Sequence, residues 1–160
     1  MLSITVLAVG RLKDRFFEDA AKEYLKRLSA YAKVEVVEVK AAELPENPSA
    51  ALIAAALERE GEALLKKIPA GAGVITLCVE GRQLSSEAFA DAIEKKALSG
   101  ASQLVFVIGG SYGLAERVKR RSFLRLSMSE MTFPHRLARI MLLEQLYRAF
   151  KISRGETYHK

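Results

Sequence analysis

The sequence predicts an α/β fold, with a mainly parallel sheet that carries helices on both faces. Apolar runs of strand length alternate with stretches of helical period along the whole chain, a pattern typical of β-α-β units. Two of these runs, residues 73–79 and 103–108, are almost entirely apolar, as strands covered on both sides are. The 160 residues show no internal repeat or low-complexity tract, so we expect a single domain spanning residues 1–160.

We expect five strands and five helices. The strands are residues 3–9, 34–39, 73–79, 103–108 and 123–128. The helices are residues 16–28, 50–68, 86–97, 115–120 and 134–152. Each strand but the last is thus followed by a helix before the next strand begins, which is the connection that parallel pairing requires.

Local signals mark the ends of several elements. Residues 34–39 alternate apolar and charged side chains, which indicates a half-buried strand. The stretch 41–49 has two prolines and predicts a loop, after which Ser49 or Asn47 caps the second helix. The GRQLS sequence after residue 79 predicts a turn, and Ser85 or Ser86 caps the third helix.

Composition argues against several classes of protein. The single cysteine, Cys78, lies in an apolar run and is interpreted as a small core residue of a protein from a reducing compartment. The two histidines, 24 positions apart, and the lack of a CxxC or HExxH pattern indicate no metal site. The N-terminus lacks signal-peptide features, and the last helix is too charged to span a membrane. We expect a soluble cytoplasmic protein.

A glycine-rich loop, GGSYG at residues 109–113, follows the fourth strand. Glycines after a buried strand let the backbone approach a flat or charged ligand that a Cβ would exclude. The loop lacks the GxGxxG spacing and the later acidic residue of a dinucleotide site, and it is not a phosphate loop. A tight strand-to-helix turn without a ligand remains the alternative.

Positive charge is concentrated beside this loop. Residues 114–160 hold 11 Lys and Arg against 4 Asp and Glu, whereas residues 1–113 hold 14 against 15. Ten of these eleven form the basic set, and they are Arg117, Lys119, Arg120, Arg121, Arg125, Arg136, Arg139, Arg148, Lys151 and Arg154. Such an excess indicates an anionic partner, with Lys and Arg contacting phosphates. A solvated basic face is the alternative.

The last predicted helix is apolar around nearly its whole circumference. Its apolar residues are Leu137, Ile140, Met141, Leu142, Leu146, Tyr147 and Phe150. A helix of this kind must be buried on more than one side. We therefore favour a homodimer in which this helix contacts the second copy, over a central helix in a monomer. At its start, His135 has either a packing role or a chemical one.

Several longer strings resemble a known family. IGGSYGL, LSMSEMTFPHRLARIMLLEQLYRAFKI and the terminal YHK are similar to the RlmH-type large-subunit ribosomal RNA methyltransferases of the SPOUT superfamily. ITVLAVGRLKD and ITLCVEGRQLSSE, nearer the N-terminus, fit the same family, so the resemblance covers essentially the whole chain. It implies a homodimer and a C-terminal trefoil knot, which topology rules alone would disfavour because knots are rare.

The resemblance also implies an activity. Family members transfer a methyl group from S-adenosylmethionine to N3 of a pseudouridine in 23S ribosomal RNA, on assembled ribosomes and without a metal. No membrane or DNA partner is expected.

Carried over residue by residue, the resemblance implies a cofactor pocket built from three strand-end loops. Its residues would be Leu77, Gly109, Met128, Ser129, Glu130, Met131, Thr132 and Phe133. Gly110 and Gly113 would shape the middle loop.

We hypothesise that the C-terminal tail serves catalysis from across the dimer. His159 would accept or relay the proton of the acceptor nitrogen, Tyr158 would stack on the base or hydrogen-bond to it, and Arg154 would stabilise charge on the pyrimidine oxygens. Substrate positioning alone, with water taking the proton, is the alternative.

Two other functions remain possible from the sequence. The first is a ribosome-associated RNA-binding factor that performs no chemistry. The second is a flavodoxin-like protein that binds a small nucleotide and would be yellow when purified with flavin.

Overall fold

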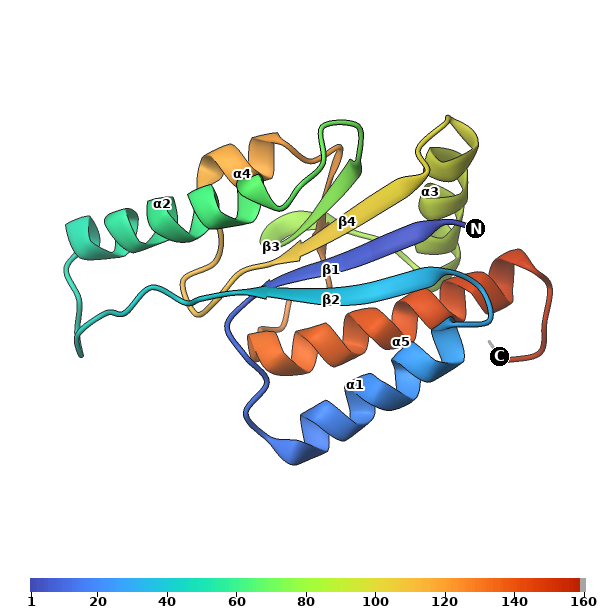
Figure 1. Ribbon diagram of the computed structural model, residues 1–160, viewed down its shortest axis with the longest axis horizontal. Coiled ribbons are helices and arrows are strands. Elements are labelled where there is room, and N and C mark those ends of the chain that lie inside the picture. Colours follow the sequence, from blue (N-terminus) through green and yellow to red (C-terminus); the bar gives the residue numbers. More distant parts are fainter. Residues whose placement is uncertain (159–160) are drawn as a thin grey trace.

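The computed structural model describes residues 1–158, which form five strands and five helices (Figure 1). The strands are β1 (Ser3–Val9), β2 (Lys33–Val39), β3 (Gly73–Gln83), β4 (Gln103–Ile108) and β5 (Leu124–Ser127). The helices are α1 (Arg15–Leu28), α2 (Ala50–Lys66), α3 (Ser86–Leu98), α4 (Glu116–Arg120) and α5 (His135–Ser153). All ten predicted elements are therefore present, most of them within one or two residues of their expected ends.

The strands form one sheet in the order β2-β1-β4-β3-β5, and every neighbouring pair is parallel. The predicted α/β class with a parallel sheet is confirmed. Because all five strands point the same way, their carboxyl ends lie along one edge of the sheet. Ligands of open α/β sheets bind outside this edge.

Helices cover both faces of the sheet (Figure 1). Helix α5 packs between α1 and α3 on one face, where the larger buried cluster includes Phe89, Phe106 and Leu142. Helices α2 and α4 cover the other face over a smaller cluster around Val105 and Val107. The alternating side chains of β4 thus contribute to both clusters.

Serine caps begin two of these helices. The Ser49 hydroxyl accepts a hydrogen bond from the Leu52 amide at 3.2 Å, and the Ser85 hydroxyl accepts one from the Ala88 amide at 3.0 Å. Each bond satisfies an amide that has no partner within its own helix. Of the alternatives that the sequence allowed, Ser49 and Ser85 are the caps.

Strand β3 extends to Gln83, into the stretch predicted as a turn, so the prediction of a turn at Gly81 was wrong. Its pairing with β5 is interrupted after Leu77 and resumes at Arg82, opposite the same residue, Leu126. Gly81 allows this course, since a Cβ there would lie 2.7–2.8 Å from backbone atoms of β5. The glycine that looked like a turn residue instead permits two backbones to pass in close contact.

Helix α5 is central within the chain itself. Its fully buried residues are Arg139, Leu142, Leu143, Leu146 and Ala149, and most of its remaining apolar side chains are half-buried. Packing between α1, α3 and the sheet thus accounts for much of its apolar circumference. Contact with a second copy stays a prediction.

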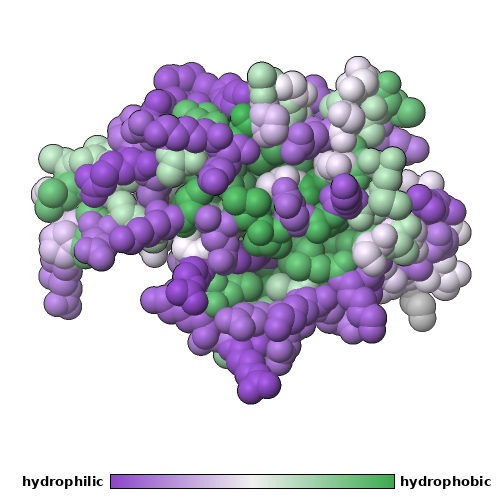
Figure 2. Space-filling model, in the orientation of Figure 1, coloured by the Kyte–Doolittle hydropathy of each residue, from purple (hydrophilic) through white to green (hydrophobic). Residues whose placement is uncertain are grey.

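One face of the molecule shows a band of hydrophobic residues between hydrophilic surfaces above and below (Figure 2). Within residues 1–158, no helix has the length and apolar character needed to cross a bilayer.

Candidate functional site

Segments of β3, β4 and β5 meet around a cavity of about 850 Å³ at the carboxyl edge of the sheet, and β3 contributes the stretch after Leu77 where its pairing with β5 is interrupted. One wall follows Leu77 of β3, a second is the GGSYG loop after β4, and a third is the segment between β5 and α5. A cavity of this volume lies in the range of small-molecule and cofactor sites. The predicted cofactor residues that line it are Leu77, Gly109, Met128, Ser129, Met131, Thr132 and Phe133.

Glu130 is the exception among the predicted cofactor residues. It is exposed and does not line the cavity. Its neighbours are held by a compact turn: the Ser127 hydroxyl donates to the Ser129 carbonyl at 3.0 Å, and the Met131 amide donates to the Ser129 hydroxyl at 3.0 Å. This turn sets the course of the chain past the cavity.

The GGSYG loop has a conformation that depends on glycine at two positions. The Gly113 amide donates to the Gly110 carbonyl at 3.1 Å, and Gly113 has a φ of +85°. A Cβ on Gly109 would lie 2.3 Å from the Gly113 carbonyl oxygen. The space in which a Cβ of Gly109 would lie is filled by the Gly113 carbonyl group, so the loop is closed tightly on itself and requires glycine at position 109.

Two side chains in the wall of the cavity, Cys78 and Glu80, have pKa values shifted by their surroundings. Burial raises the pKa of the Cys78 thiol, so this thiol is neutral near pH 7 and a poor nucleophile. A hydrogen bond from Lys119 lowers the pKa of Glu80, and the two form an ion pair at the rim. Neither of these two groups is therefore poised as a nucleophile in the cavity.

His135 also lines the cavity, and the sequence did not decide between a packing role and a chemical role for it. It is the first residue of α5 and is half-buried. Burial, followed by the charges of Arg136 and Arg139, lowers its pKa, so the imidazole is neutral at pH 7. It lines this cavity and also a second one described below.

Of the predicted catalytic residues that the structure describes, Arg154 lies at the end of α5 opposite the cavity, and Tyr158 contacts the middle of that helix. Arg154 caps the end of α5, which at 19 residues is about 28 Å long, whereas the cavity adjoins its beginning. The guanidinium carbon of Arg154 lies 4.9 Å from the centroid of the Tyr31 ring. The Tyr158 hydroxyl donates to Glu144 at 2.7 Å. Burial and this bond raise the pKa of Tyr158. His159 lies outside the described residues.

Many of the basic side chains counted from the sequence are already engaged. Arg139 is only 2% exposed, and it donates to Glu38 at 2.6 Å and to the Gly10 carbonyl at 3.1 Å. The interpretation of Arg139 as a phosphate contact was therefore wrong. Ion pairs with acidic side chains also engage Arg117, Lys119, Arg125, Arg148 and Lys151.

The sequence did contain a signal for the burial of Arg139. Leu142, Leu143 and Leu146 follow it at the spacings that share one helix face, and all three are fully buried. An arginine on the apolar face of a helix is expected to have a specific partner, because a buried unpaired charge is costly.

A family model described as "Predicted SPOUT methyltransferase" matches residues 2–159. The chain belongs to the SPOUT methyltransferase family. It is therefore an enzyme of a methyltransferase family. This assignment replaces the alternative of a flavodoxin-like nucleotide-binding protein. The resemblance inferred from the sequence strings is confirmed.

Curated relatives of this SPOUT methyltransferase cover nearly its full length. A protein from Pelotomaculum thermopropionicum is 56% identical over 159 residues, 99% of each chain, and is named ribosomal RNA large subunit methyltransferase H. Relatives of the same name from Bacillus thuringiensis and Bacillus anthracis are each 50% identical over 99% of this chain and all of their own. In the part that the structure describes, no group of three or more His, Cys, Asp or Glu side chains is placed to hold a metal.

Proposed function

We propose that this protein transfers a methyl group from S-adenosylmethionine to N3 of a pseudouridine in 23S ribosomal RNA, acting in the cytoplasm on assembled ribosomes. The observation that carries the proposal is the cavity where three strand-end loops converge beside Gly109. Seven of the eight residues that the resemblance assigns to the cofactor line this one cavity. The names of the relatives support ribosomal RNA of the large subunit as the substrate.

The residues of the cavity fit S-adenosylmethionine. Leu77, Met128 and Phe133 offer apolar surface for the adenine ring and for the carbon atoms around the sulfonium of the cofactor, and Gly109 keeps the middle loop closed beside them. The cofactor supplies a methyl group already activated by its sulfonium. What the chain adds is alignment of donor and acceptor in line and exclusion of water.

A second copy of the chain completes the site in this proposal. Val79 and Met131 line the cavity yet are 78% and 74% exposed, so its rim is an apolar surface open to solvent. The tail of the same chain leaves from the opposite end of α5. In a dimer, the tail of the partner would cover this rim and bring Arg154, Tyr158 and His159 to the substrate. The homodimer and the trefoil knot remain predictions.

Methyl transfer to ribosomal RNA is the direct test. The protein is incubated with S-adenosylmethionine carrying a radiolabelled methyl group, and with either assembled ribosomes or free 23S RNA. Label in 23S RNA only when ribosomes are supplied is the expected result. Mapping of the labelled nucleotide then checks for a pseudouridine methylated at N3.

The same experiment addresses the alternative. Tight ribosome binding without transfer to either substrate, despite measurable cofactor binding, would contradict the proposal and favour the ribosome-associated factor that performs no chemistry.

A further inference from the structure

A second cavity, of about 630 Å³, lies at the same edge of the sheet on the other side of the GGSYG loop. It is bounded by the ends of β1 and β2 and by α2. Gly110, Ser111, Tyr112 and His135 line both this cavity and the candidate cofactor cavity. The two hollows are therefore neighbours that share one wall.

Uncommitted positive charge surrounds the second cavity. Arg11, Lys13 and Lys40 line it, all three are exposed, and none of their side chains makes an ion pair or hydrogen bond with the residues described in the structure. Arg136 adds a fourth cation, with its Nε donating to the Arg11 carbonyl at 3.3 Å. This contrasts with the basic side chains of residues 114–160, many of which are paired.

The carboxylates in the same wall have partners. Glu38 accepts hydrogen bonds from buried Arg139 at 2.6 Å and from the Leu12 amide at 3.3 Å. Glu60 accepts from the Ala42 amide at 2.9 Å. Glu60 keeps its negative charge, but Arg11, Lys13, Lys40 and Arg136 outnumber it, so the charge available to a ligand is positive.

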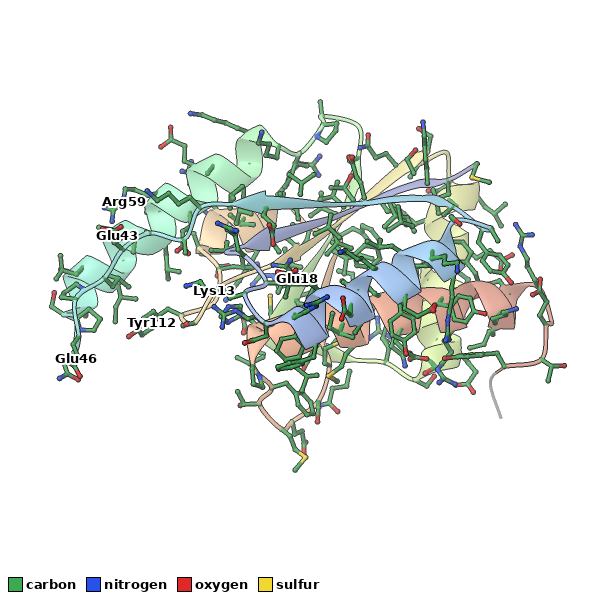
Figure 3. All side chains as sticks on the ribbon, turned by 60° about the horizontal axis from the view of Figure 1, so that its bottom comes forward. Lys13, Glu18, Glu43, Glu46, Arg59 and Tyr112 are labelled. Carbon is green, nitrogen blue, oxygen red and sulfur yellow. The ribbon has the colours of Figure 1, made fainter. Side chains whose placement is uncertain are left out.

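The cavity also offers an aromatic ring and an apolar floor. Tyr112 is 49% exposed, and Figure 3 shows its side chain near Lys13 beneath α2. Ile53, Ala56 and Leu57 of α2 form the apolar part. An exposed ring beside cations is the combination that binds unpaired nucleotides, whose bases stack on aromatic side chains while their phosphates contact Lys and Arg.

We propose that the second cavity binds a nucleotide of the substrate ribosomal RNA that flanks the methylated one. Its phosphate contacts Lys13 and Lys40, and its base lies against Tyr112. The shared wall supports this arrangement, because an RNA strand that presents one base to the cofactor cavity would place a neighbouring nucleotide at the second cavity. This assignment rests on the proposed function, since it takes ribosomal RNA as the substrate.

The test compares two double variants that change charge equally. Lys13→Gln/Lys40→Gln removes two cations from the cavity. Lys22→Gln/Lys33→Gln removes two exposed cations that line neither cavity and serves as the control. The affinity of each protein for ribosomes is measured by cosedimentation at several salt concentrations, together with its affinity for S-adenosylmethionine and its methylation kinetics.

We expect the cavity variant to bind ribosomes at least tenfold more weakly, with a salt slope smaller by about 1 because the contacts to one phosphate are lost. Its KM for ribosomes rises while its kcat and its cofactor affinity stay within about twofold. The control variant keeps an affinity close to that of the unmodified protein. Tyr112→Ala weakens ribosome binding about tenfold, and Tyr112→Phe, which retains the ring, restores it.

Failure of this inference is distinguishable from failure of the proposed function. Equal ribosome affinity and salt slope for the two double variants overturn the nucleotide site, even if methyl transfer is normal. If the unmodified protein binds ribosomes but transfers no methyl group, the proposed function fails, and the binding comparison still decides the role of the cavity. No binding of the unmodified protein to ribosomes overturns both.

Discussion

Replacing Gly109 with alanine tests the geometry of the candidate cofactor site most directly. The new Cβ would lie 2.3 Å from the Gly113 carbonyl oxygen and 3.1 Å from a methyl group of Leu114. Ordinary contact needs about 3.4 Å. The two arms of the loop must therefore separate by about 1 Å, in a loop held by the Gly113–Gly110 hydrogen bond. Overpacking of this kind costs about 1–3 kcal/mol of unfolding free energy.

The same displacement is expected to weaken cofactor binding. Gly109 and its neighbours form a wall of the cavity, so a shift of about 1 Å breaks contacts between the backbone and the cofactor. A loss of about 1.4 kcal/mol of binding free energy is a tenfold loss of affinity. We expect at least a tenfold increase in the Kd for S-adenosylmethionine, measured by isothermal titration calorimetry. Stability is measured by urea unfolding at one protein concentration, because a dimer would make it concentration-dependent.

Two other glycines provide matched controls. A Cβ on Gly110 would meet Val9 at 3.4 Å, which is ordinary contact, and a Cβ on Gly71 would meet nothing within 4 Å. Gly110→Ala should keep the unfolding free energy within about 0.5 kcal/mol. Gly71→Ala, remote from the cavity, should leave both stability and cofactor affinity unchanged. If Gly109→Ala binds the cofactor as tightly as Gly71→Ala does, the close approach at Gly109 is not part of the site.

Three further predictions concern the pair that joins α5 to β2, the histidine between the cavities and the tail. Glu38→Gln leaves the buried Arg139 charge without its carboxylate and should lower the free energy of unfolding by about 2–4 kcal/mol. The double variant Glu38→Gln/Arg139→Met should recover part of this loss. If urea unfolding shows that the losses of the single variants simply add, the two side chains are not coupled. Because folding lowers the pKa of His135, the unfolded chain binds the proton first as the pH falls below 6.5, and the free energy of unfolding should decrease over this range. His135→Asn should remove the contribution of this histidine to the decrease, as measured by thermal unfolding between pH 5 and 7. Arg154→Ala and Tyr158→Phe should each lower kcat for ribosome methylation at least tenfold with unchanged cofactor affinity, as should the corresponding alanine variant of His159; full rates in all three would refute a catalytic tail.

Much of the candidate site was predictable from the sequence because its residues lie at strand ends. In a parallel sheet these ends meet along one edge, so residues after the third, fourth and fifth strands are bound to be near one another. Glu130 lies outside the cavity for a local reason: in the turn that follows β5, the hydroxyl of Ser129 accepts a hydrogen bond from the amide two residues on, and the intervening side chain is exposed.

The distribution of charge along the sequence was a poorer guide. The basic excess of residues 114–160 pointed to the last helix, yet Arg139 is buried in a pair with Glu38, a residue 101 positions away. Lys13 and Lys40 belong to residues 1–113, which have no net positive charge, and they become a basic site only where the ends of β1 and β2 converge. Counting charges along a segment does not reveal which of them already have partners.

The sequence by itself determined the α/β class, the five strands and five helices, and the strand-end loops that make the candidate cofactor cavity. These follow from hydrophobic period, caps and glycines, which act over a few residues. Only the tertiary structure decided the strand order, the passage of β3 against β5 at Gly81, the ion pair of Arg139 and the second cavity. Those depend on contacts between residues tens of positions apart, which form because the sheet and its two helical layers must bury apolar surface together.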